Sequence, residues 1–257
     1  MEVSTRPGGR WRAWLELLRV PNLLTVPGDV LAGWLLAGGR GHPALLFALA
    51  ASLGLYAFGL VSNDIADFKT DTRERPQRPL PSKRIKPLPA VGVALALGCG
   101  APLLAWLANG NAFECAVLLF LVIVLYNTMM KESALFGPLT LGLCRGLNLL
   151  LGAAASTQAT AAGLRSVPLA NTVGVGIAAL VLMVYIVAVS ALARREVETG
   201  RAGLIGALLR GLLPLQAVIC LGASLWLGAG PLGWGAAAVL LALWPVAGWL
   251  SKRFYMS

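Results

Sequence analysis

Charged residues are scarce in this chain: they make up 12% of its 257 residues, about half of the roughly 25% that is usual in soluble domains. Hydrophobic residues make up 58%, and the mean hydropathy is +0.76. A chain with so little charge cannot cover a surface that faces water on all sides, which excludes an ordinary soluble domain. The composition therefore predicts an integral membrane protein.

Histidine and paired cysteines are also missing. The single histidine, His42, lies at the edge of an apolar segment, which argues against histidine-based catalysis. No CxxC spacing occurs, so neither a disulfide framework nor a cysteine metal site is predicted. The cysteines, all within apolar segments, are Cys99, Cys115, Cys144 and Cys220. No alternating strand pattern appears either, so any crossing of a bilayer must be helical.

What the chain does contain is a series of apolar segments about 20 residues long, the length that crosses a bilayer at 1.5 Å per residue. They predict an all-α, polytopic membrane bundle of about eight helices, in a single domain covering residues 1–257. The predicted spans are 15–37, 43–62, 89–108, 112–130, 134–157, 169–192, 203–228 and 231–250.

The net charge of +10 raises the question of a nucleic-acid partner. Eight spans would place both termini on one face, together with the loops that follow spans two, four and six. That face would hold nearly all of the Lys and Arg, whereas the opposite face would hold only Arg40 and Arg165. This positive-inside bias predicts a multi-pass protein of the cell's inner membrane with both termini in the cytoplasm. Basicity then reflects topology, and nucleic acid is not predicted as a partner.

Three aspartates follow the second span in "LVSNDIADFKTDTRERPQRPLPSKRI", residues 60–85. Asp64, Asp67 and Asp71 lie at i, i+3 and i+7, within about 60° of each other on a helix, and Asn63 lies beside them. Carboxylates held together favour a cation between them. Mg²⁺ takes oxygen ligands from one or two carboxylates plus substrate phosphates. The pattern therefore predicts a site for Mg²⁺ and a diphosphate.

Basic residues follow directly and could hold the remaining phosphate charge. They are Arg73, Arg75, Arg78, Lys83 and Arg84. The alternative is a solvated loop whose charges only set topology, but it leaves the aspartate face unexplained.

At these residues the sequence resembles the UbiA superfamily of membrane prenyltransferases. "NDIADFKTD" and "RPLPSKRI" resemble its first aspartate-rich motif and basic loop. "LLRVPNLLT" (17–25), "LYNTMMK" (125–131) and "GLCRGLNLLLG" (142–152) are similar to its opening segment, its tyrosine-to-lysine stretch and its fifth helix. The resemblance covers most of residues 15 to 200 and is greatest to the EboC-type branch. The family normally has nine spans, so a ninth helix is possible.

The resemblance implies a bundle that opens to the cytosol and transfers a prenyl group from an isoprenoid diphosphate to a small, often aromatic acceptor, with Mg²⁺ as cofactor. Residues 63–88 would form a cytoplasmic aspartate and basic loop. The implied metal ligands are Asp64, Asp67 and Asp71. The implied diphosphate contacts are Asn63, Arg78, Arg84 and Lys131. Asn22 and Tyr126 would line the substrate cavity.

The family's second aspartate motif is degenerate here, at residues 190–202. Within "VSALARREVETG" (189–200), Ser190 and Ala193 stand near the expected aspartates. Arg194 or Arg195 could bind the diphosphate in place of a second metal ion. Alternatively, this half of the site has decayed, or the segment is a plain positive-inside loop.

The sequence departs from the family's usual residues at two further places. The acids that remain, Glu196 and Glu198, point to different helix faces at i and i+2 and would chelate poorly. In the basic loop, Lys83 replaces the small residue that is usual in the family.

Arg145 and Asn148 lie on one face inside the fifth span. Because charge is costly at membrane depth, such residues face a cavity or a partner. Both are candidates for the substrate cavity, and the alternative is a buried pair between Arg145 and an acid such as Asp29. Gly142 and Gly146 predict close approach of a neighbouring helix.

Three functions remain open at this point. The first is Mg²⁺-dependent prenyl transfer. The second is a non-catalytic member that binds an isoprenoid or a lipid-linked precursor and acts in assembly or transport. A secondary transporter fits less well, because the carboxylates stand at the membrane edge rather than its midplane.

Overall fold

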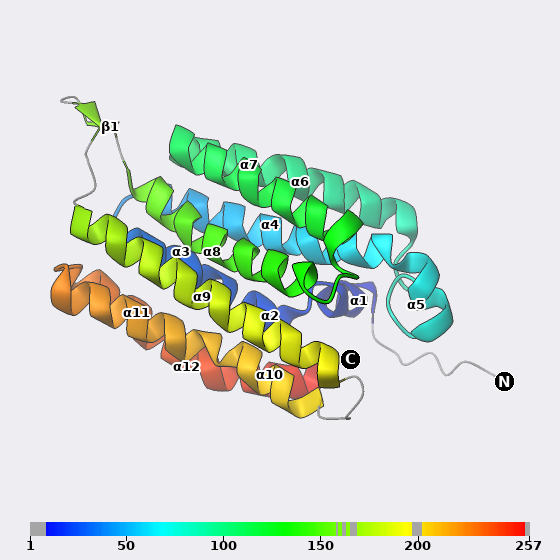
Figure 1. Ribbon diagram of the computed structural model, residues 1–257. Helices are drawn as coiled ribbons and strands as arrows, with labels where there is room; N and C mark the ends of the chain where they lie inside the picture. The colour runs from blue at the N-terminus through cyan, green and yellow to red at the C-terminus, as the bar shows by residue number, and fades with distance from the viewer. Residues whose placement is uncertain (1–8, 158, 161–162, 165–168, 197–201, 255–257) are drawn as a thin grey trace.

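The computed structural model describes residues 9–157, 159–160, 163–164, 169–196 and 202–254. These ranges are almost entirely helical (Figure 1), which confirms the predicted all-α bundle. The helices are α1 (Arg10–Leu17), α2 (Val20–Leu23), α3 (Val26–Leu36), α4 (Ala44–Ala66), α5 (Phe68–Glu74), α6 (Pro87–Ala108), α7 (Gly110–Leu125), the π-helix η1 (Tyr126–Met130), α8 (Phe136–Ser156), α9 (Leu169–Glu196), α10 (Ala202–Arg210), α11 (Leu212–Trp226) and α12 (Gly230–Phe254). Strands β1 (Ala159–Thr160) and β2 (Gly163–Leu164) pair antiparallel.

Seven helical segments in the described ranges are long and apolar enough to cross a membrane. They correspond to the predicted spans from the second to the eighth. Large apolar side chains such as Leu95, Leu121 and Ile177 are exposed on their outer surfaces, as lipid contact requires. The chain is therefore a multi-pass membrane protein, while the exact number of spans stays a prediction.

The first predicted span, 15–37, is wrong as a single helix, because it breaks into α1, α2 and α3. Pro21 and Pro27 fall in the first turns of α2 and α3, where a missing N–H is tolerated but cannot continue a preceding helix. Arg19, between α1 and α2, takes a left-handed φ of 45°. Val20–Leu36 is consequently a shorter apolar segment than the spans.

Close backbone contacts between helices set the shape of the interior. α3 packs against α8 and α11, α4 against α6, and α8 against α9. A Cβ at Gly152 of α8 would lie 2.1 Å from the Val30 carbonyl oxygen of α3, and one at Gly142 would lie 2.6 Å from the Met183 carbonyl oxygen of α9. The close approach expected at Gly142 is thus confirmed.

The ends of the bundle differ in character (Figure 1). α5 lies at one end with α1, and the β1–β2 hairpin lies at the other.

Residues 190–196 were expected in a loop but belong to α9, because alanine, leucine, arginine and glutamate continue a helix readily. Glu198, and the side chains of Arg195 and Glu196, lie outside the described part of the chain.

Candidate functional site

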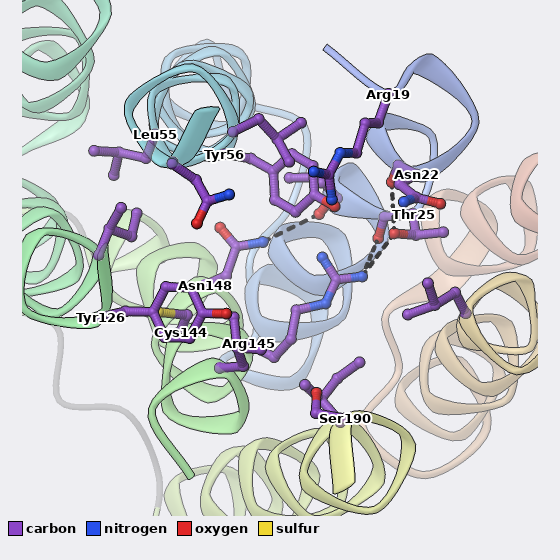
Figure 2. A pocket seen from close by; sticks show the side chains of 18 of the residues that line it. Arg19, Asn22, Thr25, Leu55, Tyr56, Tyr126, Cys144, Arg145, Asn148 and Ser190 are labelled. Carbon is purple, nitrogen blue, oxygen red and sulfur yellow. Dashed lines mark hydrogen bonds between the residues drawn. The ribbon is translucent and has the colours of Figure 1, made fainter. Parts of the chain in front are cut away.

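A cavity of about 390 Å³ opens between the helices, a size that suits a small-molecule ligand. The predicted cavity residues Asn22, Tyr126, Arg145 and Asn148 all line it (Figure 2). Much of the remaining wall is apolar and includes Leu55, Ile123, Leu141, Ile186, Leu209 and Leu212. Whether these residues contact a substrate stays a prediction.

The floor of the cavity is polar and centres on Arg145. Its Nη1 lies 3.1 Å from Oδ2 of Asp29, which confirms the buried pair. Its Nη2 donates to the Thr25 hydroxyl at 2.8 Å and to the Thr25 carbonyl oxygen at 3.1 Å (Figure 2). Arg145 therefore pairs with the acid and also lines the cavity, while its contact with a substrate stays a prediction.

Three amide and hydroxyl side chains complete this floor. Asn148 donates to Asp29 Oδ2 at 2.9 Å and accepts from the Ser52 hydroxyl at 2.6 Å. Gln216 of α11 donates to Asp29 Oδ1 at 2.6 Å. The network ties α3, α4, α8 and α11 together and gives both oxygens of the buried Asp29 a partner. Sequence reasoning missed Ser52 and Gln216, although a glutamine inside an apolar span is itself a signal.

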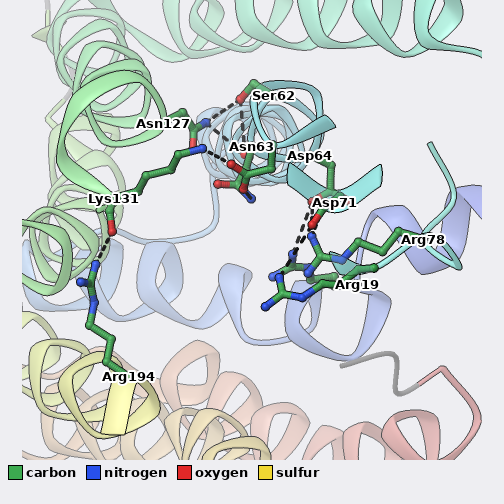
Figure 3. A network of polar contacts seen from close by, with 12 residues as sticks. Arg19, Ser62, Asn63, Asp64, Asp71, Arg78, Asn127, Lys131 and Arg194 are labelled. Atoms are coloured by element: carbon green, nitrogen blue, oxygen red, sulfur yellow. Dashed lines mark hydrogen bonds and ion pairs between the residues drawn. The ribbon is translucent and has the colours of Figure 1, made fainter. Parts of the chain in front are cut away.

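At the mouth of the cavity, two of the three aspartates share one cation (Figure 3). Arg78 Nη1 lies 2.6 Å from Oδ2 of Asp71 and 3.7 Å from Oδ1 of Asp64. Arg19, which lines the cavity, adds a second cation 3.4 Å from Asp64. Both carboxylates are buried, so these arginines offset the cost of removing negative charge from water.

The third aspartate, Asp67, has different partners. It forms an ion pair with Lys131 and accepts a hydrogen bond of 3.1 Å from Asn63. Helical hydrogen bonds nevertheless continue from α4 to α5, because the Asp67 N–H donates to the Asn63 carbonyl oxygen at 2.9 Å and the Asp71 N–H to the Asp67 carbonyl oxygen at 2.8 Å. The shared face of the three carboxylates stays a prediction. Within the described residues, no group of three Asp, Glu, His or Cys side chains is arranged to hold a metal ion.

The donor chemistry nevertheless fits Mg²⁺. Asp64 and Asp71 lie close enough to share one guanidinium nitrogen, and Mg²⁺ commonly uses one or two carboxylates plus phosphate oxygens. Arg78, now between the carboxylates, also has the planar fork that suits phosphate. The assignment of Asp64, Asp67 and Asp71 as metal ligands stays a prediction.

The π-helix η1 determines how Tyr126 and Lys131 face the mouth. The Lys131 N–H donates to the Tyr126 carbonyl oxygen at 3.1 Å, a bond across five residues. In an α-helix, residues five apart differ by about 140° in direction, whereas the π-turn stacks them on one side. Asn127, which is buried, anchors the turn to α4 by donating to the Ser62 hydroxyl at 2.7 Å.

Two predicted diphosphate contacts have other partners in this structure. Arg194 donates to the main-chain carbonyl oxygens of Lys131 and, at 3.3 Å, of Glu132 (Figure 3). Arg84 donates to Glu16 at 2.5 Å. Neither arginine lines the cavity, and their direct contact with a diphosphate stays a prediction.

Several residues that line the cavity were not predicted, and the wall formed by α9 contains two positions of the degenerate second motif. Arg19, Tyr56 and Asn127 line the cavity; Arg19 could have been found as the isolated cation within "LLRVPNLLT". Ser190 and Ala193 also line it, so the positions where the second aspartate motif is expected do face the cavity.

The sequence was compared with protein families and with curated proteins, and both comparisons identify membrane prenyltransferases. The model of the UbiA prenyltransferase family matches residues 29–256. A digeranylgeranylglyceryl phosphate synthase from Ignicoccus hospitalis is 31% identical over 209 residues, covering 80% of this chain and 62% of the relative. The chain thus spans less than two thirds of the length of the curated relatives it matches. These names do not confirm the similarity to the EboC-type branch, which stays a prediction.

Solved structures show the same fold. A structure of digeranylgeranylglyceryl phosphate synthase matches with a TM-score of 0.58 and 20% identity, covering 96% of this chain and 94% of the other. A UbiA homologue from Archaeoglobus fulgidus bound to GPP and Mg²⁺ matches with a TM-score of 0.58 and 14% identity, covering 94% and 87%.

Proposed function

Because the chain belongs to the UbiA prenyltransferase family, we propose that it transfers a prenyl group from an isoprenoid diphosphate to a small acceptor, with Mg²⁺ as cofactor. The observation that carries this proposal is the joining of a charged mouth to an apolar cavity. Arg19 and Asn63 line the cavity and also contact the aspartates of the mouth. The homologue that binds GPP and Mg²⁺ supports the same choice of donor and metal.

In the proposed reaction, the bond between C1 of the prenyl group and the diphosphate oxygen breaks, and its electron pair leaves with the diphosphate. A nucleophilic atom of the acceptor forms the new bond to C1, and its proton passes to the departing diphosphate. Arg78, Lys131 and Asn63 are assigned to the diphosphate, where charge-assisted hydrogen bonds stabilise the departing anion. The apolar wall keeps water away from the electron-deficient C1.

Asp64, Asp67 and Asp71 would hold Mg²⁺, which when bound supplies positive charge to the diphosphate. For the two that share Arg78, metal binding requires the guanidinium to turn toward the diphosphate, which is a suitable partner for it. The mouth lies at the end of the bundle that carries α1 and α5. The positive-inside bias supports a cytoplasmic location for this end.

One observation favours the second function, a protein that binds an isoprenoid or lipid precursor without catalysis. Among the cavity-lining residues that the structure describes, none carries a carboxylate. The wall formed by α9 offers Ser190 and Ala193 where a second pair of metal ligands would stand. A site with one acidic half can bind a diphosphate without activating it.

The two functions separate in one experiment on the full chain in lipid nanodiscs. Consumption and binding of geranylgeranyl diphosphate are measured with and without EDTA, in the presence of 4-hydroxybenzoate or geranylgeranylglyceryl phosphate. We expect EDTA or Asp64→Asn to reduce consumption at least about 100-fold, because the first removes Mg²⁺ and the second removes a carboxylate that would hold it, and the charge of Mg²⁺ stabilises the leaving diphosphate. Glu74→Gln, an exposed acid of α5, is the control and should change little. Tight binding with no donor consumed would favour the non-catalytic function.

A further inference from the structure

The floor of the cavity contains N–H donors of Arg145 that have no hydrogen-bond acceptor among the described residues. Arg145 has five N–H donors, and its Nη2 is bonded to Thr25. Within the described residues, its Nε and Nη1 have no hydrogen-bond acceptor, although Nη1 lies near Asp29 as an ion pair. The residue is only 7% exposed and lines the cavity. Buried donors are rarely left unpaired, so these point to a partner inside the cavity.

The polar groups of Asn148 and Thr25, which lie beside Arg145, already have partners of their own. Asn148 already uses its oxygen to accept from Ser52 and its nitrogen to donate to Asp29. The Thr25 oxygens already accept from Nη2 of Arg145 and, at the carbonyl, from Gln216. These fixed contacts hold the guanidinium in place, as Figure 2 shows for its bonds to Thr25.

The charge of the floor restricts what can bind there. Asp29 neutralises Arg145 at 3.1 Å, so the pair has no net positive charge to offer. An anion brought to this depth would add a negative charge without compensation, which is costly away from water. A hydroxyl or carbonyl oxygen accepts hydrogen bonds without that cost. The floor therefore suits a neutral oxygen and does not suit a phosphate.

Its depth separates the floor from the mouth. Ser52, bonded into the floor, and Asn63, at the mouth, both lie on α4, and their spacing corresponds to about 16 Å along the helix. The Ser52 end of the floor therefore lies far below a diphosphate held at the mouth. An apolar prenyl chain would leave the spare donors unpaired, and it has an alternative apolar wall at Ile186, Leu209 and Leu212.

We propose that the cavity floor around Arg145 is the subsite for a neutral hydroxyl or carbonyl oxygen of the acceptor. That the bound molecule is an acceptor rests on the proposed function. The binding of its oxygen can be tested without any turnover. In this arrangement the acceptor approaches the donor from below, with its oxygen on the floor and its nucleophilic atom toward the mouth.

The test compares two probes of nearly equal shape, 4-methylphenol and p-xylene, in which a methyl group replaces the hydroxyl. Affinities for the full chain in nanodiscs are measured by calorimetry, with empty nanodiscs subtracted and no metal or donor present. We expect the phenol to bind about tenfold more tightly. Arg145→Lys, which keeps a cation beside Asp29 but removes Nε, should reduce this preference to about twofold or less. Arg210→Lys, outside the cavity lining, should keep it.

Two results would overturn the proposal. Equal affinity of the two probes for the natural chain would mean that water alone satisfies the donors, and this comparison needs no variant to fold. Displacement of 4-methylphenol by geranylgeranyl diphosphate would assign the floor to the prenyl chain. A chain that prefers the phenol but never consumes a donor would retain the oxygen subsite and lose the proposed transferase function.

Discussion

The two sides of the cavity mouth use charge in opposite ways. On the side of α4 and α5, Asp64 and Asp71 are buried and already face the cations Arg19 and Arg78. On the side of α9, Arg194 donates to main-chain carbonyl oxygens beyond η1, and Ser190 and Ala193 line the wall. One side is built from groups that can exchange partners with a metal and a phosphate. The other side fixes the position of a neighbouring segment.

This difference changes the interpretation of the degenerate second motif. An arginine in place of acidic residues was expected to bind the diphosphate itself. In the structure, Arg194 instead holds the main chain at Lys131, whose ammonium group pairs with Asp67 (Figure 3). We therefore propose that Lys131 contacts the diphosphate directly and that Arg194 acts on it only by positioning Lys131.

The largest effect that separates these roles is expected from Lys131→Met. Removing an ammonium that bonds a diphosphate loses a charge-assisted hydrogen bond of about 2 kcal/mol, which corresponds to about thirtyfold weaker donor binding. The measurement is the affinity for geranylgeranyl diphosphate in nanodiscs containing Mg²⁺. Lys69→Met, an exposed lysine of α5, is the matched control and should bind the donor normally. If both variants lose affinity equally, only the general positive charge of this face matters.

The sequence predicted the helical architecture well, because apolar segments of membrane length leave the backbone no other way to be satisfied. Prediction from the sequence failed where local backbone geometry determines where a helix begins and ends. Pro21 and Pro27 divide the first predicted span into α1, α2 and α3. The partners of the aspartates were not predicted either, because Asp64 and Asp71 share Arg78 whereas Asp67 pairs with Lys131.

Part of the site could not be predicted because it depends on contacts between distant segments. Asp29, Arg145 and Gln216 meet from α3, α8 and α11, and only the pairing of Asp29 with Arg145 was considered from sequence. The π-turn that aligns Tyr126 with Lys131 has no recognised sequence signal. The role of Arg194 likewise depends on where the chain after η1 passes α9.

A double-mutant cycle tests whether Arg194 acts through Lys131. Arg194→Ala alone should weaken donor binding about fivefold, because the ammonium of Lys131 loses its fixed position. In the Lys131→Met background, the same substitution should have almost no effect, since residues that act as a unit are not additive. Donor affinity and kcat are measured for the four proteins. Fully additive losses would mean that Arg194 contacts the diphosphate independently.

The smallest expected effect concerns Lys83 and asks whether the basic loop contributes charge or backbone geometry to its side of the mouth. Lys83 has a φ of 60°, in the left-handed region that costs an ordinary residue about 1–2 kcal/mol. This accounts for the small residue that is usual here in similar proteins. Lys83→Gly removes the cost but adds about 0.5–1 kcal/mol of backbone entropy to the unfolded chain. We therefore expect the free energy of unfolding to rise by about 0.5 kcal/mol.

The measurement is unfolding by SDS titration in mixed micelles, combined with donor affinity. Lys86→Gly is the control, because Lys86 is also exposed but has an ordinary φ of −72° at the N-cap of α6, so glycine there relieves no left-handed backbone cost and should leave stability unchanged within about 0.5 kcal/mol. Donor affinity should stay within about twofold for both variants, because exposed charges are screened by salt. A clear loss of affinity in Lys83→Gly alone would show that the Lys83 ammonium takes part in holding the diphosphate, and the charged side of the mouth would then extend from Arg78 along the loop.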